Sequence, residues 1–352
     1  MNKHLFPYKW KLSDGYNNQN KGRVFGTFIC GGGSSMGYKL AGFDHIGGVE
    51  IDPKVASVYK KNHRPEYLYI EDIRDFNKRD DLPEELYNLD ILDGSPPCST
   101  FSISGSREKS WGRKKKFREG QALQTLDDLV FEYCKTINKL QPKIFLLENV
   151  KGIIAGNAKW YSKQVVKLLN NYGYTVQVFK LDSSTMGVPQ RRERVFFIGH
   201  KKELQYPKLK LEFNEEKIVY RNIIGPHGKP LSERDNGIWA KRVKNDNSFS
   251  DTLERLGEKI SNWSIKYIHQ NKVCVTIMAT NSQLIDYEVP CYVSDEKIKQ
   301  IGTYPIDYDF QGVNVNYLVG MSVPPVMIAH IASQIYAQWL SIQTSKMAPV
   351  KR

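Results

Sequence analysis

The chain has 352 residues, 40% hydrophobic and 25% charged, which is the balance of a soluble globular enzyme with one large domain or one large and one small. No stretch approaches the roughly 20 apolar residues that a membrane span needs, and the opening MNKHLFPYKWKLSDG lacks the apolar core of a signal peptide. We therefore expect a cytoplasmic protein without membrane contact. The net charge of +13 favours a polyanionic partner, because each neutralised phosphate releases counterions, although a merely basic protein would have the same charge.

Short apolar runs alternate with helical stretches through the first 200 residues. After a polar arm over residues 1–22, the run VFGTFIC leads into the turn GGGSSMG and a helix. Six more runs follow: HIGGVEID, YLYIEDI, NLDILDGSPPC, PKIFLLENV, TVQVFKLD and RVFFIGH. Predicted helices separate most of them, among them Pro53–Asn62, Thr125–Leu140 and Tyr161–Tyr172. This alternation predicts an α/β fold, a Rossmann-like doubly wound parallel sheet that binds ligands at the carboxyl ends of its strands.

The pattern changes after about residue 200. Residues 201–310 are rich in Lys, Asn, Ser, Tyr and Ile without regular alternation, which predicts a second, smaller, irregular and basic domain. The segment NYLVGMSVPPVMIAHIASQIYAQWL is predicted to begin with a turn and continue as a helix, apolar at helical spacing from Val326 to Leu340. We therefore predict three parts: 1–200, 201–310, and 311–352, whose helix returns to the first part.

A glycine turn, from Gly31 to Gly37, follows the first predicted strand. Glycines let the backbone approach a ligand, and the N-terminus of the following helix favours anionic groups. Glu50 ends the second strand and Asp72 the third, where carboxylates can accept hydrogen bonds from ribose hydroxyls or an adenine amino group. Taken singly, each carboxylate fits a capping or exposed residue better. Together with the turn they predict a nucleoside-cofactor site.

Two prolines and a cysteine mark the next site. Pro96-Pro97 can continue neither a strand nor a helix, so Cys98 is predicted to be held in a rigid turn at the ligand crevice. A basic surrounding would raise its thiolate fraction. The chain has five cysteines, an odd number without C-x-x-C spacing, so we expect neither a disulfide framework nor a metal site. The basic run Arg107–Arg118 fits a mobile phosphate-contacting loop, although a solvated loop has the same pattern.

Two further segments carry candidate catalytic groups. Glu148 ends a buried strand, where an acid suits proton transfer, although alone it fits a capping or salt-bridged residue better. Gln190, Arg192 and Arg194 alternate along an extended segment, so we predict that they face the same way. Such donors suit a phosphate or a base edge, and an exposed edge strand is the alternative.

In chain order these segments resemble the bacterial and phage DNA cytosine-5 methyltransferases, from about Arg23 to Leu340. The shared series is a glycine-rich turn, an acid after the next strand, Asp-Ile, Pro-Cys, Glu-Asn-Val, Gln-x-Arg-x-Arg, a variable stretch and Gly-x-Ser-Val-Pro-Pro. The resemblance implies a class I methyltransferase fold, S-adenosylmethionine as cofactor, double-stranded DNA as partner, and residues 201–310 as a target-recognition domain. The target base would be flipped out of the helix, since this chemistry cannot reach a stacked base.

The resemblance also implies residue roles. Cys98 would add to C6 of the cytosine, Glu148 would bind and protonate N3, and Arg194 with Arg192 would contact the carbonyl. Glu50 would hold the ribose and Asp72 the adenine. The family's cofactor contacts fall on Phe28, Gly31, Gly33, Glu50, Ile51, Asp72, Ile73, Pro97, Leu129, Ser322 and Val323. Its DNA contacts fall on Ser102, Ser104, Arg107, Arg113 and Gln190.

The sequence departs from the family pattern at three positions. Cys30 stands in a turn that is usually Phe-x-Gly-x-Gly-Gly, Met321 replaces an asparagine before Ser-Val-Pro-Pro, and Cys291 stands where a structural arginine is usual. These changes affect the turn, the expected methyl-donor pocket and the expected packing of the two domains. None of them removes a residue assigned to bond-making.

Three other functions remain as alternatives. An RNA cytosine-5 methyltransferase would share the active site, but the long basic recognition stretch favours duplex DNA. A catalytically silent DNA-binding relative would have no reason to keep Cys98, Glu148, Arg192 and Arg194. A thiol oxidoreductase would need a second cysteine nearby or a nicotinamide fingerprint, and the sequence has neither. We therefore expect a monomeric methyltransferase of the restriction-modification type, and leave open whether a cognate endonuclease accompanies it.

Overall fold

The computed structural model describes residues 4–97, 128–156, 158–259, 265–279 and 283–342. The chain forms two compact units. The sheet unit comprises Tyr16–Asp182, Glu193–Glu212 and Ile328–Arg352. The mixed unit comprises Met1–Gly15, Ser183–Arg192 and Phe213–Met327. These ranges cut across the predicted parts 1–200, 201–310 and 311–352. Compactness alone does not locate a functional boundary, so the three-part division stays a prediction.

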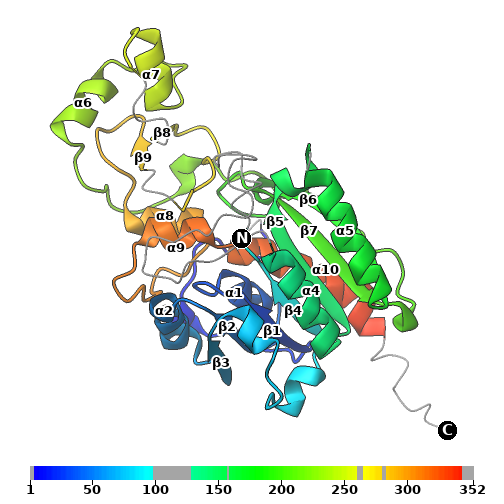
Figure 1. Cartoon of the computed structure of the whole chain (residues 1–352). Coiled ribbons are helices and arrows are strands. Elements are labelled where there is room, and N and C mark those ends of the chain that lie inside the picture. The colour runs from blue at the N-terminus through cyan, green and yellow to red at the C-terminus, as the bar shows by residue number, and fades with distance from the viewer. Residues whose placement is uncertain (1–3, 98–127, 157, 260–264, 280–282, 343–352) are drawn as a thin grey trace. The chain divides into compact units, whose positions relative to one another are not determined.

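The sheet unit is built on seven strands in the order β3-β2-β1-β4-β5-β7-β6 (Figure 1). Strands β1 to β5 pair in parallel, and β7 runs antiparallel to both of its neighbours, β5 and β6. The bounds are β1 Arg23–Thr27, β2 Asp44–Glu50, β3 Tyr67–Ile70, β4 Ile91–Gly94, β5 Ile144–Val150, β6 Tyr174–Asp182 and β7 Glu193–Lys201. All seven apolar runs therefore form strands, and the predicted α/β class is confirmed. The carboxyl ends of β1 to β5 meet at one edge of the sheet.

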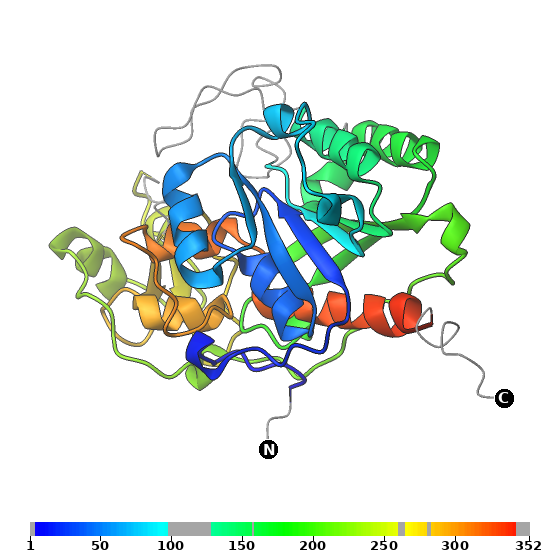
Figure 2. The same ribbon diagram turned by 90° about the horizontal axis from the view of Figure 1, so that it is seen from below.

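Helices cover both faces of this sheet (Figure 2). They are α1 Gly33–Leu40, α2 Pro53–His63, α3 Ile73–Phe76, α4 Leu129–Leu140, α5 Ala158–Asn171 and α10 Pro325–Ile335, which continues as a π-helix over Tyr336–Leu340. Consecutive strand residues point to opposite faces, and β2 shows the consequence. The ring of His45 lies 3.2 Å from the Ser35 hydroxyl on α1 and 3.3 Å from the Tyr59 hydroxyl on α2. Ile46 packs into the core formed with α3, α4 and α5.

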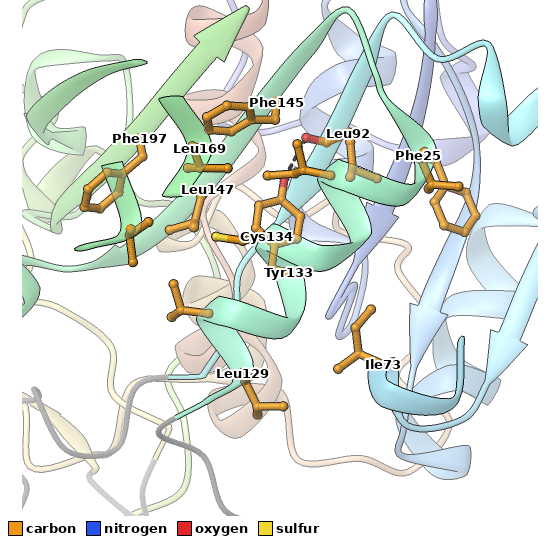
Figure 3. Close-up of a cluster of buried hydrophobic side chains, with 14 of the residues drawn as sticks. Phe25, Ile73, Leu92, Leu129, Tyr133, Cys134, Phe145, Leu147, Leu169 and Phe197 are labelled. Carbon is orange, nitrogen blue, oxygen red and sulfur yellow. Dashed lines mark hydrogen bonds between the residues drawn. The ribbon is translucent and has the colours of Figure 1, made fainter. Parts of the chain in front are cut away.

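That core fixes α4 against the middle of the sheet (Figure 3). Tyr133, Cys134 and Ile137 on α4 are fully buried between strands β4 and β5 and helix α5. The Tyr133 hydroxyl lies 2.8 Å from the Leu92 carbonyl oxygen on β4 and 2.9 Å from that of Leu146 on β5. A buried hydroxyl that finds acceptors avoids a desolvation penalty. The first residue of α4, Leu129, is thereby placed near the carboxyl edge of the sheet.

The mixed unit has little regular strand structure among its described residues, in agreement with the irregular second domain predicted. It contains the parallel pair β8 and β9 and a small core of Phe249, Ile265, Tyr267 and Ile285. Its elements are α6 Glu233–Ala240, α7 Phe249–Arg255, β8 Lys266–Ile268, β9 Leu284–Asp286, α8 Asp295–Ile301 and α9 Val315–Met321. Helix α9 stands where a turn was predicted, because the Asn314 side chain caps it by accepting from the Tyr317 backbone N–H at 2.9 Å.

The N-terminal arm is divided between the units, with its residues up to Gly15 in the mixed unit and those from Tyr16 in the sheet unit. The Trp10 indole is buried and donates to the Thr303 carbonyl oxygen at 2.9 Å. The backbone N–H groups of Leu12 and Ser13 donate to the Asp307 carboxylate at 2.7 and 3.0 Å. These bonds join residues at opposite ends of the sequence.

One helical stretch, Val315–Leu340, is long and apolar enough to cross a membrane. Its most apolar window is 83% buried inside the structure. Such burial is typical of a core helix, so the stretch gives no support for a membrane span.

Candidate active site

The glycine turn after β1 has a constrained backbone. Phe28, Cys30 and Gly32 all adopt left-handed conformations, with φ of +54°, +48° and +76°. Gly32 is required twice over, since a Cβ there would also lie 2.1 Å from Nε2 of His63. Cys30 pays about 1–2 kcal/mol for a conformation that glycine adopts freely. This gives a physical reason why the family pattern has several glycines in this turn.

Glu50, the last residue of β2, is tied to this turn. Its carboxylate is buried and accepts from the Cys30 N–H at 2.9 Å and from the Asp52 N–H at 3.0 Å. Burial raises the pKa of Glu50, and the hydrogen bonds from the Asp52 and Cys30 backbone oppose that rise. The Asp52 side chain in turn caps α2. Both predicted cofactor elements, the turn and the acid, therefore lie together at the carboxyl edge of β1 and β2.

Asp72 lies after β3 and caps the short helix α3. It accepts from the Arg74 N–H at 2.8 Å, and the Arg74 guanidinium forms an ion pair with its other oxygen at 3.0 Å. The next residue, Ile73, is buried in the core shared with α4. The capping role that the sequence left open is thus present. The predicted contact with adenine stays a prediction, as do those of Ile51, Ile73 and Leu129 with the cofactor.

The ends of β4 and β5 are joined by a side chain. Asn149 is buried and its amide donates to the Pro96 carbonyl oxygen at 3.2 Å. This bond anchors the chain two residues before Cys98. Cys98 itself lies outside the described residues, as do Ser102, Ser104, Arg107 and Arg113.

Glu148 and Arg194 form a buried ion pair at this edge of the sheet. The Arg194 Nε lies 2.8 Å from Glu148 Oε1, and the two side chains are 14% and 10% exposed. Both lie on one face because β5 and β7 are antiparallel neighbours and Val150 pairs with Arg194. Burial lowers the pKa of Arg194 and the Glu148 carboxylate opposes this, but an arginine remains charged at any physiological pH. The pair brings a predicted acid and a predicted carbonyl-binding cation together.

Gln190 and Arg192 have other partners than Arg194 does, and that the three side chains face the same way stays a prediction. Arg192 lies in the mixed unit, where its guanidinium donates to the carbonyl oxygens of Ile277 and Gly320, both at 2.8 Å. Gln190 is 1% exposed and its side-chain oxygen accepts from the Ile277 N–H at 3.0 Å. Strand β7 begins at Glu193, so Arg194 lies within it and the other two residues precede it.

The last predicted cofactor residues lie between α9 and α10. The Ser322 hydroxyl accepts from the Tyr304 hydroxyl at 2.6 Å and donates to the Leu318 carbonyl oxygen at 2.9 Å, and Val323 is buried. Met321, the departure from the family's asparagine, is 40% exposed. These positions remain predicted contacts.

The family assignment follows from a sequence match that spans the sheet and the site residues described above. The C-5 cytosine-specific DNA methylase family model matches residues 23–337, which include every strand of the sheet and both members of the Glu148–Arg194 pair. The chain belongs to this family. The methylase is therefore an enzyme of the DNA methyltransferase class, as the sequence motifs predicted.

Its relatives are type II methyltransferases. The methylase is 32% identical to M.FnuDI of Fusobacterium nucleatum over 259 residues, 71% of this chain and 67% of that protein. It is 31% identical to M.NgoPII of Neisseria gonorrhoeae over 213 residues, 58% of this chain and 57% of that protein. A crystal structure described as a prophage-encoded DNA modification methyltransferase of E. coli shares the fold, with a TM-score of 0.62 and 19% identity, covering 90% of this chain and 99% of the other.

Sequence reasoning missed two buried or half-buried charged residues beside the methylase's predicted site. Asp93 lies in β4 and accepts from the Tyr38 hydroxyl at 3.1 Å, and burial raises its pKa to about 7. A carboxylate inside the apolar run NLDILDG was the available signal. Arg74 bridges Asp72 to Asp128, and nothing in the sequence indicates a contact across 54 residues.

Proposed function

We propose that this methylase is a DNA (cytosine-5-)-methyltransferase. It would transfer a methyl group from S-adenosylmethionine to C5 of a flipped-out cytosine in a specific duplex sequence, through a covalent bond between Cys98 and C6. The observation that carries the proposal is the buried Glu148–Arg194 pair at the carboxyl edge of the sheet, in a chain of the methylase family. Ligands of doubly wound sheets bind at this edge.

The glycine turn and Glu50 fit the proposed cofactor. The turn packs its backbone closely against His63 at Gly32, next to the start of α1, and Glu50 holds a buried carboxylate where ribose hydroxyls need an acceptor. S-adenosylmethionine, when bound, supplies an electrophilic methyl group. The residues proposed to hold it are Phe28, Gly31, Gly33, Glu50, Ile51, Asp72, Ile73, Pro97, Leu129, Ser322 and Val323.

The ion pair matches one edge of a cytosine. Arg194 uses Nε for Glu148 and Nη1 for the Glu193 carbonyl oxygen at 2.8 Å. No hydrogen bond from Nη2 to any described residue is found, so Nη2 can donate to the O2 carbonyl of the base. Glu148 uses Oε1 for Arg194, and its Oε2 has no hydrogen bond within the described ranges. That oxygen is available to hold a proton at N3, the ring atom next to C2.

The protein's groups would then act in sequence. The Cys98 thiolate adds to C6 while Glu148 protonates N3, so the displaced electron pair makes C5 nucleophilic. After C5 has gained its methyl group, a base removes the C5 proton, the electron pair of that bond restores the C5–C6 double bond and expels the Cys98 thiolate, and N3 returns its proton to Glu148. Arg192 would hold the backbone of the mixed unit in place, since its two Nη groups donate to the carbonyl oxygens of Ile277 and Gly320.

The decisive experiment is base-resolution methylation sequencing of plasmid DNA from a host without cytosine methylation of its own. The wild type should place 5-methylcytosine at one recurring sequence, and Cys98→Ser should place none. Cys291→Ser is the matched control, because it makes the same atomic change at a thiol to which no chemical step is assigned. Methylation by Cys98→Ser would remove Cys98 from the mechanism. A wild type that modifies no cytosine in DNA would contradict the proposal and direct the assay to RNA.

Target recognition and partners form the rest of the proposal. Residues 201–310 would read the target, with Ser102, Ser104, Arg107, Arg113 and Gln190 as further DNA contacts. Gln190 would have to give up its present hydrogen bonds to do so. We expect a monomer in the cytoplasm, and leave open whether a cognate restriction endonuclease is its partner. Gel filtration with and without a duplex target checks the stoichiometry, and a restriction challenge of the modified plasmid checks for protection.

A further inference from the structure

Arg74 joins the starts of two helices at the proposed cofactor site. Its Nη1 donates to both oxygens of Asp72, at 3.2 and 3.0 Å, and its Nη2 donates to Asp128 at 2.6 Å. Asp72 directly precedes α3 and Asp128 directly precedes α4. The residues that follow them, Ile73 and Leu129, belong to one buried core (Figure 3). Three of these five residues, Asp72, Ile73 and Leu129, are among those proposed to hold the cofactor.

This bridge is not what holds α3 and α4 together. The Arg74 side chain is 27% exposed and Asp128 is 48% exposed, and ion pairs this open to water contribute little to folding stability. The helices are already joined by partly buried hydrogen bonds around Asn77. Thr136 Oγ1 donates to the side-chain oxygen of Asn77 at 2.8 Å, and the side-chain amide of Asn77 donates to the Glu132 carbonyl oxygen at 3.1 Å. The main effect of the Arg74 side chain is therefore on the orientation of the Asp72 carboxylate.

That effect is to fix the direction of the acceptor sites on Asp72. The Arg74 N–H and Nη1 occupy positions on Oδ1, and Nη1 also contacts Oδ2. A carboxylate has about four acceptor sites, so the remaining ones point in set directions while these bonds hold. Without the Arg74 guanidinium only the backbone N–H of residue 74 still donates to Oδ1, so the carboxylate can turn about that bond, and Asp72 and Asp128 lose their common cation. An acceptor that must be ordered on binding gives weaker and less selective binding than one already ordered.

We propose that Arg74 is a positioning residue that aims the Asp72 carboxylate at the amino group of the adenine and so sets the base specificity of the cofactor site. The inference rests on the proposed function, because it takes the cofactor to be an adenine nucleoside. Arg74 does not itself contact the adenine. It makes the adenine amino group, rather than the 6-oxo group of a hypoxanthine, the complement of Asp72.

The test uses calorimetric titration of the purified chain with S-adenosylhomocysteine and with S-inosylhomocysteine, which has a carbonyl in place of the amino group. The wild type should bind the adenosyl compound at least about tenfold more tightly, the scale of one hydrogen bond to a charged acceptor. Arg74→Met should lose roughly five- to tenfold in affinity for the adenosyl compound and little for the inosyl compound, so that the preference collapses. Thermal unfolding should be almost unchanged.

Arg79→Met is the matched control, since Arg79 also bridges two carboxylates, Glu71 at 3.3 Å and Asp81 at 2.6 Å, and is similarly exposed. It should keep the preference. Adding Arg74→Met to Asp72→Ala should cause no further loss of affinity, because the residue acts through Asp72. Equal losses of affinity for both compounds, equal effects of the two arginine variants, or additive losses in the double variant would each overturn this inference and leave the proposed function intact. A wild type that binds neither compound would instead overturn the proposed cofactor, and the inference with it.

Discussion

Asp93 costs this methylase stability at neutral pH, and replacing it with asparagine should return that stability. The carboxyl is 3% exposed in β4 and accepts from the Tyr38 hydroxyl at 3.1 Å. Burial raises its pKa from an ordinary 3.8 to about 7, the Tyr38 and Ser34 hydrogen bonds oppose that rise, and the charge of Glu148 adds to it. An asparagine keeps the acceptor for Tyr38 and has no charge to bury.

The magnitude follows from proton linkage. Between pH 3.8 and about 7 the folded chain binds the Asp93 proton and the unfolded chain has released it, so wild-type stability falls as the pH rises through this range. The full fall is about 4 kcal/mol, at 1.36 kcal/mol for each pH unit between the two values. Between pH 5 and pH 8, the free energy of unfolding of Asp93→Asn should therefore rise relative to wild type by about 3 kcal/mol.

Urea unfolding at several pH values between 5 and 8 measures this difference directly. The control is Asp75→Asn, the same substitution at a side chain that is 63% exposed and not buried. A stability difference for Asp93→Asn that stays constant from pH 5 to pH 8 would refute the reasoning. So would a difference that grows as the pH falls.

Three further predictions concern the proposed site. Gly32→Ala should lower the free energy of unfolding by at least about 2 kcal/mol and abolish cofactor binding, because its Cβ would overlap the His63 ring; near-normal urea unfolding would contradict this. Arg192→Met should destabilise the chain by about 2–4 kcal/mol, because two buried carbonyl oxygens lose their donors; unchanged stability with weakened DNA binding would favour a direct DNA contact. Glu50→Ala should weaken S-adenosylmethionine binding by about 1–3 kcal/mol in calorimetry, and unchanged affinity would remove Glu50 from the ribose site.

The sequence predicted most of the sheet because each strand is a continuous apolar run. A strand covered on both faces must be largely apolar, as in the parallel β5 (PKIFLLENV) and in the antiparallel β7 (RVFFIGH). The predicted Glu148 and Arg194 lie at the ends of two such runs, and the structure pairs them. The segment predicted as a turn forms the short helix α9, which Asn314 caps and which ends before Pro324 and Pro325.

Contacts between distant parts of the chain were beyond such patterns. Gln190 and Arg192 were predicted to alternate with Arg194 along one extended segment, but their partners in the mixed unit, Ile277 and Gly320, follow from no pattern in the sequence. Likewise, Asp72 was predicted from its place after a strand, but its ion pair through Arg74 to Asp128 depends on how α3 packs against α4. Periodicity reports which face a residue occupies and carries no information on its partner.

The burial of Trp10 has a consequence for how this chain is made. Its partner, Thr303, lies 293 residues later in the sequence, so at ~5–20 residues per second the ribosome needs roughly 15–60 s to supply it. Throughout that interval the indole lacks its acceptor, and the mixed unit cannot close before its last segments emerge. Synthesis rate, chaperone supply and N-terminal fusions should therefore affect the yield of this unit more than that of the sheet unit, whose β1 to β5 pair over shorter separations.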